Sequence, residues 1–392
     1  MANAIIPLAL NMIIDDVGWH NGRDERYKNR PSRSGLPRLH HPNDVLALNE
    51  IGKKLNMKIV CSLVLGEWDR KNILRGVPHV TWDPEGWDAA GAIDLEYTER
   101  YFKALEESEY LDYALHGLQH GYYVDGKLIT ECPYYPYSKK DENGNRIVNW
   151  LPPEEFEEVV RLFFEIYNDW GFKKKIRIFA SPGGCLGTPE DEGNKIYADI
   201  LKKYGITVWG NRWPCFEQSS ETLEELMLVK TYGKIPWDAY DVDPRLLEIS
   251  TKENGKEIFP SFVGHLTNFI RFNPENNFER VDDWANYFLK QAEEFGIMLA
   301  RDIEFSAAQA LYQRFASLTE EENEIKIDTA AVDAKATIAE KNTLYVSIKR
   351  GKSPVFCSGG EISLYEEKRD FKTYKIERSG DSKITIKLKD ET

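Results

Sequence analysis

The sequence predicts an α/β fold: a distorted (β/α) barrel of about seven strands, followed by a small C-terminal all-β domain. From residue 5 to about residue 317, short apolar runs alternate with segments of helical periodicity. The apolar runs carry hydrophobic residues on both faces, which is typical of a parallel sheet covered by helices. From about Glu322 the strands alternate apolar and polar residues, as half-buried antiparallel strands do. We therefore assign residues 1–318 to the barrel and residues 322–392 to a small antiparallel β accessory domain.

The first predicted strand is the apolar segment that runs into Asp15 and Asp16. A helix over residues 43–55 follows, because Asn43 and Asp44 are residue types that cap helices. It leads into MKIVCSLVLG, a β-branched run too short and continuous for an amphipathic helix. A second helix, over residues 94–107, precedes the strand LDYALH.

The later part of the barrel repeats this alternation. The segment EEFEEVVRLFFEIYNDWG places apolar residues on one helical face and Gly171 just after its end, so it predicts a helix before the strand IRIFAS. A helix closed by Gly205 precedes the strand ITVWG, and the strand in EIFPSFVGH precedes a helix over residues 282–295. We expect the β tail to be a structural lid or docking module rather than a carbohydrate-binding module.

The composition excludes several classes of protein. The net charge is −14 with no long basic run, which argues against a nucleic-acid or anionic-membrane surface. No apolar run reaches the roughly 20 residues of a membrane span. The five cysteines are scattered and lack CxxC spacing, so they indicate neither a disulfide framework nor a thiolate metal site. The N-terminus lacks the basic region of a secretory signal, so we expect a cytoplasmic protein or one whose leader has been removed.

Residues that can bind a metal ion follow the predicted strands. In a (β/α) barrel the carboxyl ends of the strands meet at one mouth. The first strand ends at Asp15 and Asp16, LDYALH ends at His116, and FPSFVG is followed by His265. His120 stands four residues after His116, a spacing that lets one turn present both rings to a zinc-like ion. We predict a metal site there, with one aspartate as a ligand and the other as a base.

The histidine pair is not the zincin motif. In H-E-x-x-H the glutamate after the first histidine is the general base, whereas Gly117 holds that position here. A base must therefore come from elsewhere. Asp15 and Asp16 follow a strongly apolar strand, which favours a place at the mouth over a role as a helix cap or turn.

The order of these motifs resembles the polysaccharide deacetylase family (the NodB homology domain). IIDD, then H-x-x-x-H about a hundred residues later, then FASPGG before a helix ending in LKKYGI, and finally a late strand ending in a histidine occur over residues 8–318. The resemblance implies a distorted (β/α) barrel and the metal-dependent removal of N- or O-acetyl groups from a carbohydrate.

The resemblance also implies roles for individual residues. Asp15 would be the general base, and His265 would be the general acid that protonates the leaving amine or alcohol. The backbone N–H of Gly183 would belong to the oxyanion hole, and Pro182 would shape the pocket. The ligands of the divalent metal, commonly zinc, would be Asp16, His116 and His120.

The sequence departs from the family pattern in its third motif. Ala180 stands where many members have an arginine, and Ser181 replaces the first proline. Gly117 replaces the usual serine or threonine after the first metal histidine. Because the family arginine orients the base, another arginine would have to take its place, or nothing does. The candidates are Arg177, Arg212, Arg245 and Arg301.

Aromatic side chains in the predicted mouth loops can stack on sugar rings, which present apolar faces and polar edges. We expect Trp19 and Trp213 to do so, with core packing as the alternative for each. We expect His40, His41 and His79 in surface loops, with a metal role as the alternative for His40 and His41. We expect His20 in a loop, with an approach to the mouth as its alternative.

Two other functions fit the same residues. One is an amide hydrolase of the same barrel type, acting on a small cyclic ureide or imide. The other is a carbohydrate-binding protein that has lost turnover, which the missing arginine suggests. Acetate release from an acetylated carbohydrate separates the deacetylase from both.

Overall fold

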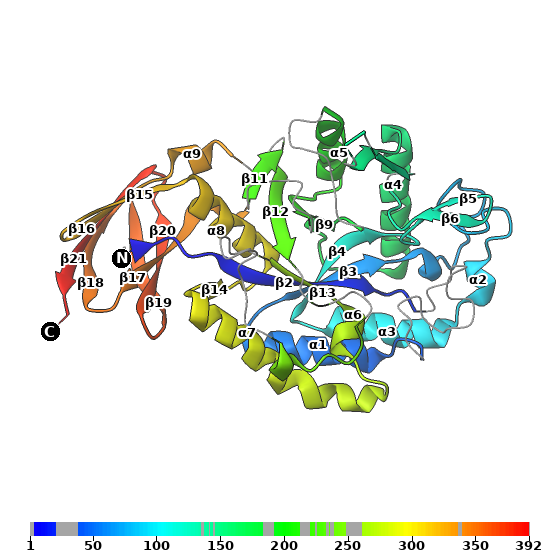
Figure 1. Ribbon diagram of the computed structural model, residues 1–392, viewed down its shortest axis with the longest axis horizontal. Coiled ribbons are helices and arrows are strands. Elements are labelled where there is room, and N and C mark those ends of the chain that lie inside the picture. The colour runs from blue at the N-terminus through cyan, green and yellow to red at the C-terminus, as the bar shows by residue number, and fades with distance from the viewer. Residues whose placement is uncertain are drawn as a thin grey trace.

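The computed structural model describes residues 4–20, 38–134, 137–140, 142–143, 146–182, 192–211, 220–223, 226–232, 235, 239–247, 261–335 and 339–391. The central sheet of this part has seven parallel strands: β2 (Ala9–Val17), β3 (Ile59–Val64), β4 (Leu111–Gly117), β9 (Ile178–Ala180), β10 (Val208–Asn211), β12 (Leu226–Tyr232) and β13 (Ser261–His265). Their order is β10-β9-β4-β3-β2-β13-β12, and β10 also pairs with β12, so the sheet curls on itself. The predicted distorted barrel is confirmed (Figure 1).

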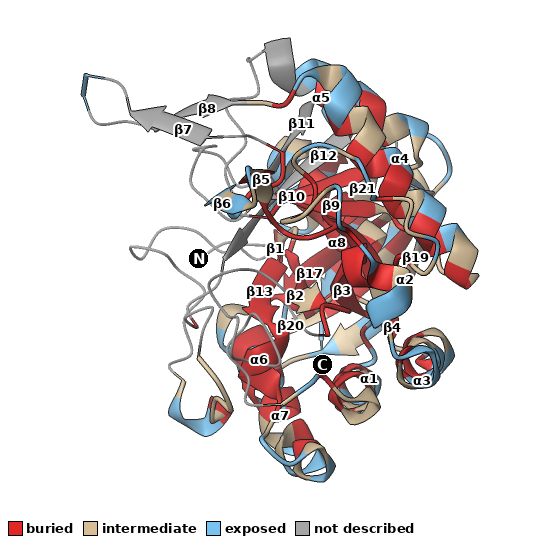
Figure 2. Ribbon diagram, turned by 90° about the vertical axis from the view of Figure 1, so that its right-hand side faces the viewer, coloured by how far each residue is buried: buried red, intermediate tan, exposed pale blue. Residues whose placement is uncertain are grey.

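Helices cover the outside of this sheet. The longer ones are α1 (Pro42–Leu55), α3 (Leu95–Glu107), α4 (Pro153–Trp170), α5 (Glu192–Lys203), α7 (Val281–Phe295) and α8 (Ile303–Phe315). Figure 2 shows buried strands at the centre and helices that expose only their outer faces. Among the described residues, no helix combines the length and apolar composition that crossing a bilayer requires.

Shorter helices and strands connect or extend these elements. The short helices are η2 (Gly66–Trp68), α2 (Ala89–Ala92), η3 (Pro244–Leu246), α6 (Leu266–Phe269), η4 (Pro274–Arg280), α9 (Ala330–Asp333) and η5 (Ala339–Asn342). The added strands are β5 (Tyr122–Val124), β6 (Lys127–Thr130), β7 (Tyr137–Lys140), β8 (Arg146–Asn149), β11 (Ser220–Leu223) and β14 (Met298–Leu299). Of these, β14 pairs with β2, and β11 pairs antiparallel with β12.

The helix ends follow the expected capping chemistry, with one correction. Gly171 ends α4 in the left-handed conformation, at a φ of 79°, as predicted. The N-cap of α1 is His41, not Asn43 or Asp44. The backbone N–H of Asn43 donates to His41 Nδ1 (3.1 Å), and the N–H of His41 donates to Asp44 Oδ2 (2.7 Å). His41 and Asp44 therefore form a reciprocal capping box.

The tail forms two antiparallel sheets of four strands each, which confirms its all-β character. The strands are β1 (Ala4–Ile5), β15 (Ser317–Glu321), β16 (Glu324–Asp328), β17 (Thr343–Lys349), β18 (Lys352–Ser358), β19 (Gly360–Glu367), β20 (Phe371–Arg378) and β21 (Lys383–Asp390). Their orders are β1-β17-β20-β19 and β15-β16-β21-β18. Since β1 pairs with β17, the segment before β2 joins these sheets (Figure 1). The division at residues 318 and 322 stays a prediction.

Candidate metal centre

A bulge at the end of β2 places two adjacent carboxylates at the barrel mouth. The register of β2 against β3 shifts between Ile14 and Val17, and Asp16 takes a φ of 64°, in the left-handed region. On a regular strand two neighbours point to opposite faces, whereas a bulge re-aims one of them. Asp16 Oδ1 lies 3.6 Å from His116 Nε2, and both Asp15 and Asp16 raise the pKa of His116.

A second irregularity ends β4. Its register against β3 shifts so that Leu63 pairs with Leu115 and Val64 with Gly117, which leaves His116 out of the pairing. Gly117 has a φ of 142°, and His120 has a φ of 48°. These left-handed residues turn the chain tightly. The rings of His116 and His120 thereby come within 4.9 Å of each other, centroid to centroid.

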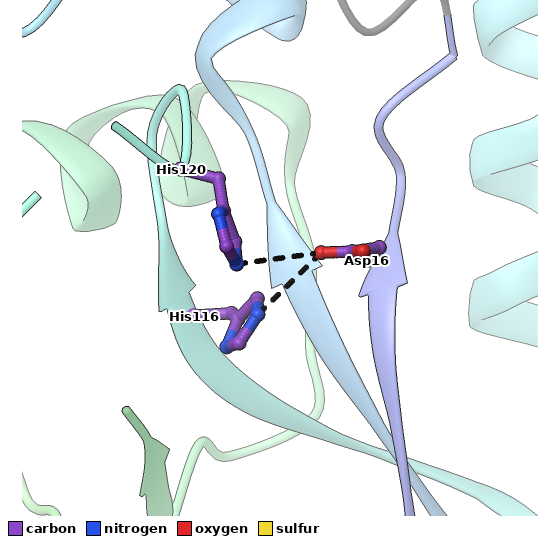
Figure 3. Close-up of side chains that lie close together, drawn as sticks. All are labelled: Asp16, His116 and His120. Carbon is purple, nitrogen blue, oxygen red and sulfur yellow. Dashed lines mark ion pairs between the residues drawn. The ribbon is translucent and has the colours of Figure 1, made fainter. Parts of the chain in front are cut away.

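The three predicted ligands converge. Nε2 of His116 and Nε2 of His120 each lie 3.6 Å from Asp16 Oδ1 (Figure 3). One ligand atom from each residue lies within 4.8 Å of the other two. Around a tetrahedral zinc with bonds of about 2.0–2.1 Å, ligand atoms stand about 3.3–3.4 Å apart. The donor set and its spacing therefore fit a divalent metal ion, with a coordination position left for water or substrate.

Neighbouring groups orient both imidazoles. His116 Nδ1 lies 2.6 Å from the carbonyl oxygen of Ala180. A proton on Nδ1 donated to that carbonyl leaves Nε2 as the lone-pair atom facing Asp16, which is the tautomer a metal requires. The ring of His120 stacks on the indole of Trp19, at 5.6 Å and an interplanar angle of 23°. Position 180 thus contributes its backbone to the site although it lacks the family arginine.

The pKa values of Asp16 and His116 are shifted by their mutual interaction. Burial by itself would raise the pKa of Asp16, but His120, His116 and His265 outweigh it and hold that pKa well below the usual value. Burial would lower the pKa of His116, but Asp15 and Asp16 outweigh it and raise that pKa. In the metal-free protein the carboxylate and the imidazoles therefore stabilise one another's charged forms.

The proposed base and acid lie on adjacent strands. Asp15 on β2 is the register partner of His265 on β13. Their exposed fractions are 7% and 8%, so both are buried. The backbone N–H of His265 donates to Asn268 Oδ1 (2.8 Å), which anchors the strand end where α6 begins. His265 also contributes to the lowered pKa of Asp16.

The other predicted site residues are only partly described. Pro182 is buried next to Ser181 at the end of β9. Trp19 is 3% exposed and packs on His120. Its stacking on a sugar stays a prediction. Gly183 and Trp213 lie outside the described residues.

The arginines suggested as substitutes occupy other places. Arg177 precedes β9 and lies 3.7 Å from Glu304, at the amino end of the strand. Arg301 lies near Asp302, and its carbonyl accepts from Lys58 beside the amino end of β3. Both are therefore at the end of the barrel opposite the mouth. Arg245 is an exposed residue, and Arg212 lies outside the described residues.

His40, expected at the surface, is buried, so that expectation is wrong, and His20, expected in a loop, follows β2 but is buried as well. His20 is 4% exposed and His40 is 1% exposed. The segment after β2 turns inward, and His20 stacks on the buried Trp68 at 5.2 Å. The position of His20, four residues after Asp16, was the available sign that it lies near the mouth. The packing of Trp19 on His120 had no sign in the sequence.

The similarity to known proteins is distant. No family model matches the sequence. No curated protein matches it. Among solved structures, the chain is similar to a CE4 family pseudoenzyme from Bacillus anthracis, at 12% identity and a TM-score of 0.34. The match covers 76% of this chain and 64% of the other, so the chain spans less than two thirds of that protein's length.

Two further structures are similar at the same level. One is a candidate polysaccharide deacetylase from Mycobacterium smegmatis, at 10% identity and a TM-score of 0.39, covering 80% of this chain and 94% of that one. The other is a GH57-type branching enzyme from the hyperthermophilic archaeon Pyrococcus horikoshii, at 12% identity and a TM-score of 0.35. It covers 78% of this chain and 65% of that one.

Proposed function

We propose that the protein is a metal-dependent hydrolase that removes N- or O-acetyl groups from a carbohydrate. The observation that carries the proposal is the convergence of Asp16 on β2, His116 on β4 and His120 just after β4 around one point at the barrel mouth. The orientation of His116 by the Ala180 carbonyl supports it, because a ligand histidine commonly donates its second ring N–H.

In this proposal Asp16, His116 and His120 hold a divalent cation, with zinc as the first choice. When bound, such a cation polarises a carbonyl group and makes a neighbouring water more acidic. Asp15 accepts the proton of the attacking water. His265 donates a proton to the departing amine or alcohol, which is a poor leaving group without it. The backbone N–H of Gly183 stabilises the developing negative charge.

The local structure supports this assignment of base, acid and metal ligands. Asp15 and His265 lie on neighbouring strands and Asp16 directly follows Asp15, so the proposed base, the proposed acid and one proposed ligand share the same end of β2 and β13. All of them are buried or nearly so, and charges interact more strongly where water is excluded. A base and an acid held at one mouth suit the two proton transfers of amide or ester cleavage.

The test combines metal content with acetate release. Protein stripped with a chelator is reloaded with zinc, cobalt, nickel or manganese, and acetate is measured with acetylated chito-oligosaccharides and acetylated xylan. We expect about one metal per chain and acetate release that requires it. His116→Ala should lose both, and Asp15→Asn should keep the metal but lose about 10²-fold or more in rate. His41→Asn, which keeps a capping side chain in α1, is the matched histidine control.

The outcomes separate the competing functions. Glycan binding with bound metal but no acetate release would identify a binding protein. Cleavage of cyclic imides without acetate release would identify an amide hydrolase. A protein that takes up no metal, or that keeps its metal after His116→Ala, would overturn the proposal.

A further inference from the structure

A cavity of about 360 Å³ borders the segment that follows β2. Among the described residues, its wall includes His20 from that segment and Glu67 from η2. Leu39, the loop before α2, α2 itself and the first turn of α3 also contribute to the wall. The residue before His20, Trp19, stacks on the metal-site residue His120. One short segment therefore borders both the cavity and the metal centre.

Several buried polar atoms of this wall have no hydrogen-bond partner among the described residues. Both ring nitrogens of His20 belong to this group, although the residue is only 4% exposed. Tyr97 Oη and Trp82 Nε1 belong to it too. Buried polar groups are normally paired, because an unpaired one costs about 1–3 kcal/mol. These four atoms on one cavity are available to hydrogen-bond a bound molecule.

Packing holds the His20 ring in place. It stacks on Trp68 at 5.2 Å, and the edges of Tyr97 and Tyr101 meet it at 5.6 and 4.7 Å. Burial, with a further contribution from His40, lowers the pKa of His20 to about 3. The ring is therefore neutral near pH 7, with one nitrogen that donates and one that accepts. A hydroxyl group both donates and accepts, so hydroxyls complement this ring.

Aromatic groups and carboxylates supply the rest of the wall. Trp82, Trp87 and Tyr97 present flat apolar surfaces of the kind that stack on sugar rings. The charged residues that line the cavity are acidic. They are Glu67, Asp88 and Asp94.

Arg38, which acts on the pKa of Tyr97, pairs with Asp44 at 2.7 Å, and two further arginines near the cavity are also engaged elsewhere. Arg75 Nε donates to the carbonyl of Trp87 (2.8 Å), and Arg100 lies over the ring of Tyr97 at 5.9 Å. Neither of them lines the cavity. The described wall is therefore negative, and it favours a ligand that carries a positive charge.

We propose that this cavity is a second sugar subsite that takes an amino-sugar residue with a free, protonated amine. Its hydroxyls would pair with His20 and Tyr97, its ring would lie on the tryptophans, and its ammonium group would face the carboxylates. The inference rests on the proposed function for the nature of the polymer. A deacetylated residue held here would place its neighbour in the chain near the metal centre, which favours removal of acetyl groups from adjacent residues.

The test uses binding to metal-free protein, so that turnover plays no part. Affinities for glucosamine, N-acetylglucosamine and glucose are measured by calorimetry at a pH where the amine is protonated. We expect glucosamine to bind at least about tenfold more tightly than either other sugar, since ~1.4 kcal/mol of charge preference gives that factor. The preference should shrink at high salt.

Variants test which carboxylates cause the preference for glucosamine. Asp88→Asn with Asp94→Asn removes two charges, while asparagine still caps α2 and α3. It should reduce the preference for glucosamine to about twofold. Tyr97→Phe should weaken binding of all three sugars. Glu96→Gln removes one exposed carboxylate in the same turn of α3 that does not line the cavity, and as the control for a nearby charge it should change nothing.

The outcomes distinguish this inference from the proposed function. Equal binding of glucose and glucosamine, or no binding of either, overturns the inference even if acetate release is found. A preference for glucosamine that Glu96→Gln abolishes as strongly as the double variant also overturns it. If the protein takes up no metal but prefers glucosamine, and Asp88→Asn with Asp94→Asn removes that preference, the subsite is supported and the proposed deacetylase function is overturned.

Discussion

Three residues in the left-handed backbone region, Asp16, Gly117 and His120, shape the metal centre. For aspartate and histidine this conformation costs on the order of 1–2 kcal/mol, which the surrounding structure has to offset. Strain of this kind collects at functional sites. Here it has a visible consequence, because the two turns bring Asp16 Oδ1 within 3.6 Å of both imidazoles.

The raised pKa of His116 makes metal binding depend on pH. Protonated His116 stabilises the folded protein through its carboxylate neighbours. This contribution is fully present below the unfolded pKa of about 6.5 and is lost as the pH rises through the higher folded pKa. A metal needs the neutral ring, so protons compete with it up to that same pKa. We expect the metal-induced rise in Tm to grow between pH 6 and pH 8. A rise that is the same at both pH values would contradict this account.

Replacement of Gly117 tests the turn that carries the histidines. Alanine there would take a φ of 142°, and its Cβ would approach Tyr134 Oη to 3.3 Å. We expect Gly117→Ala to lower the free energy of unfolding by about 1–3 kcal/mol and to weaken zinc binding about tenfold. Gly171→Ala is the control, because Gly171 has a φ of 79° with open space around it. It should be destabilising by about 1 kcal/mol and leave zinc affinity unchanged, as denaturation and metal titration would show.

At this scale the sequence predicted which residues meet but not how they are oriented. IIDD and H-x-x-x-H identified Asp16, His116 and His120, because strand ends converge in a barrel. The bulge after Ile14 and the hydrogen bond to Ala180 depend on the register between strands, which no local pattern encodes. The same is true of the burial of His20.

Among the elements, α1 is tied to the barrel by a buried carboxylate. Asp44 is fully buried, accepts two hydrogen bonds from the guanidinium of Arg38 (2.9 and 2.7 Å), and accepts a third from Asn277 Nδ2 (2.7 Å). Its Oδ2 also completes the capping box with His41. This one side chain therefore joins α1 to the segment before it and to η4.

We expect Asp44→Ala to lower the free energy of unfolding by about 3–5 kcal/mol, because it leaves Arg38 and Asn277 without their shared acceptor. Asp282→Ala is the matched control. The carboxylate of Asp282 pairs with Lys54 of α1 at 2.7 Å, but both side chains are exposed. Its loss should therefore lower the free energy of unfolding by less than about 1 kcal/mol. Urea denaturation measures both. Equal losses would show that the buried network is not the anchor of α1.

Long periodic elements were predicted best. The apolar faces and end signals of α1, α3, α4 and α7 appear directly in the sequence, and the structure has helices there. The helix α8 and the hairpin of β11 and β12 were not predicted. Most residues of α8 are buried, so its sequence lacks the polar face that marks an amphipathic helix.

In the whole molecule, the barrel and the C-terminal sheets share buried contacts through α8. The amide of Gln309, 1% exposed, donates to the carbonyls of Pro7 (2.7 Å) and Tyr345 (3.0 Å) and accepts from the N–H of Tyr345 (3.2 Å). The pairing of β1 with β17 adds a second connection. We therefore expect the two parts to unfold together.

The variant Gln309→Ala should lower the free energy of unfolding by about 2–4 kcal/mol, because it leaves buried backbone groups unpaired. Gln313→Ala, on the exposed face of the same helix, should change it by less than about 0.5 kcal/mol. Tryptophan fluorescence reports mainly on the barrel and far-ultraviolet dichroism on the whole chain. In the unaltered protein the two transitions should coincide, and two separate transitions would contradict a single cooperative unit.

The most direct test of the central claim is anomalous diffraction from crystals of the protein loaded with zinc. We predict one anomalous peak at the barrel mouth, about 2.0–2.2 Å from His116 Nε2, His120 Nε2 and a carboxylate oxygen of Asp16. Its absence in crystals of His116→Ala would support the assignment. No peak among these three residues at saturating zinc, or a peak bound only by other side chains, would contradict it.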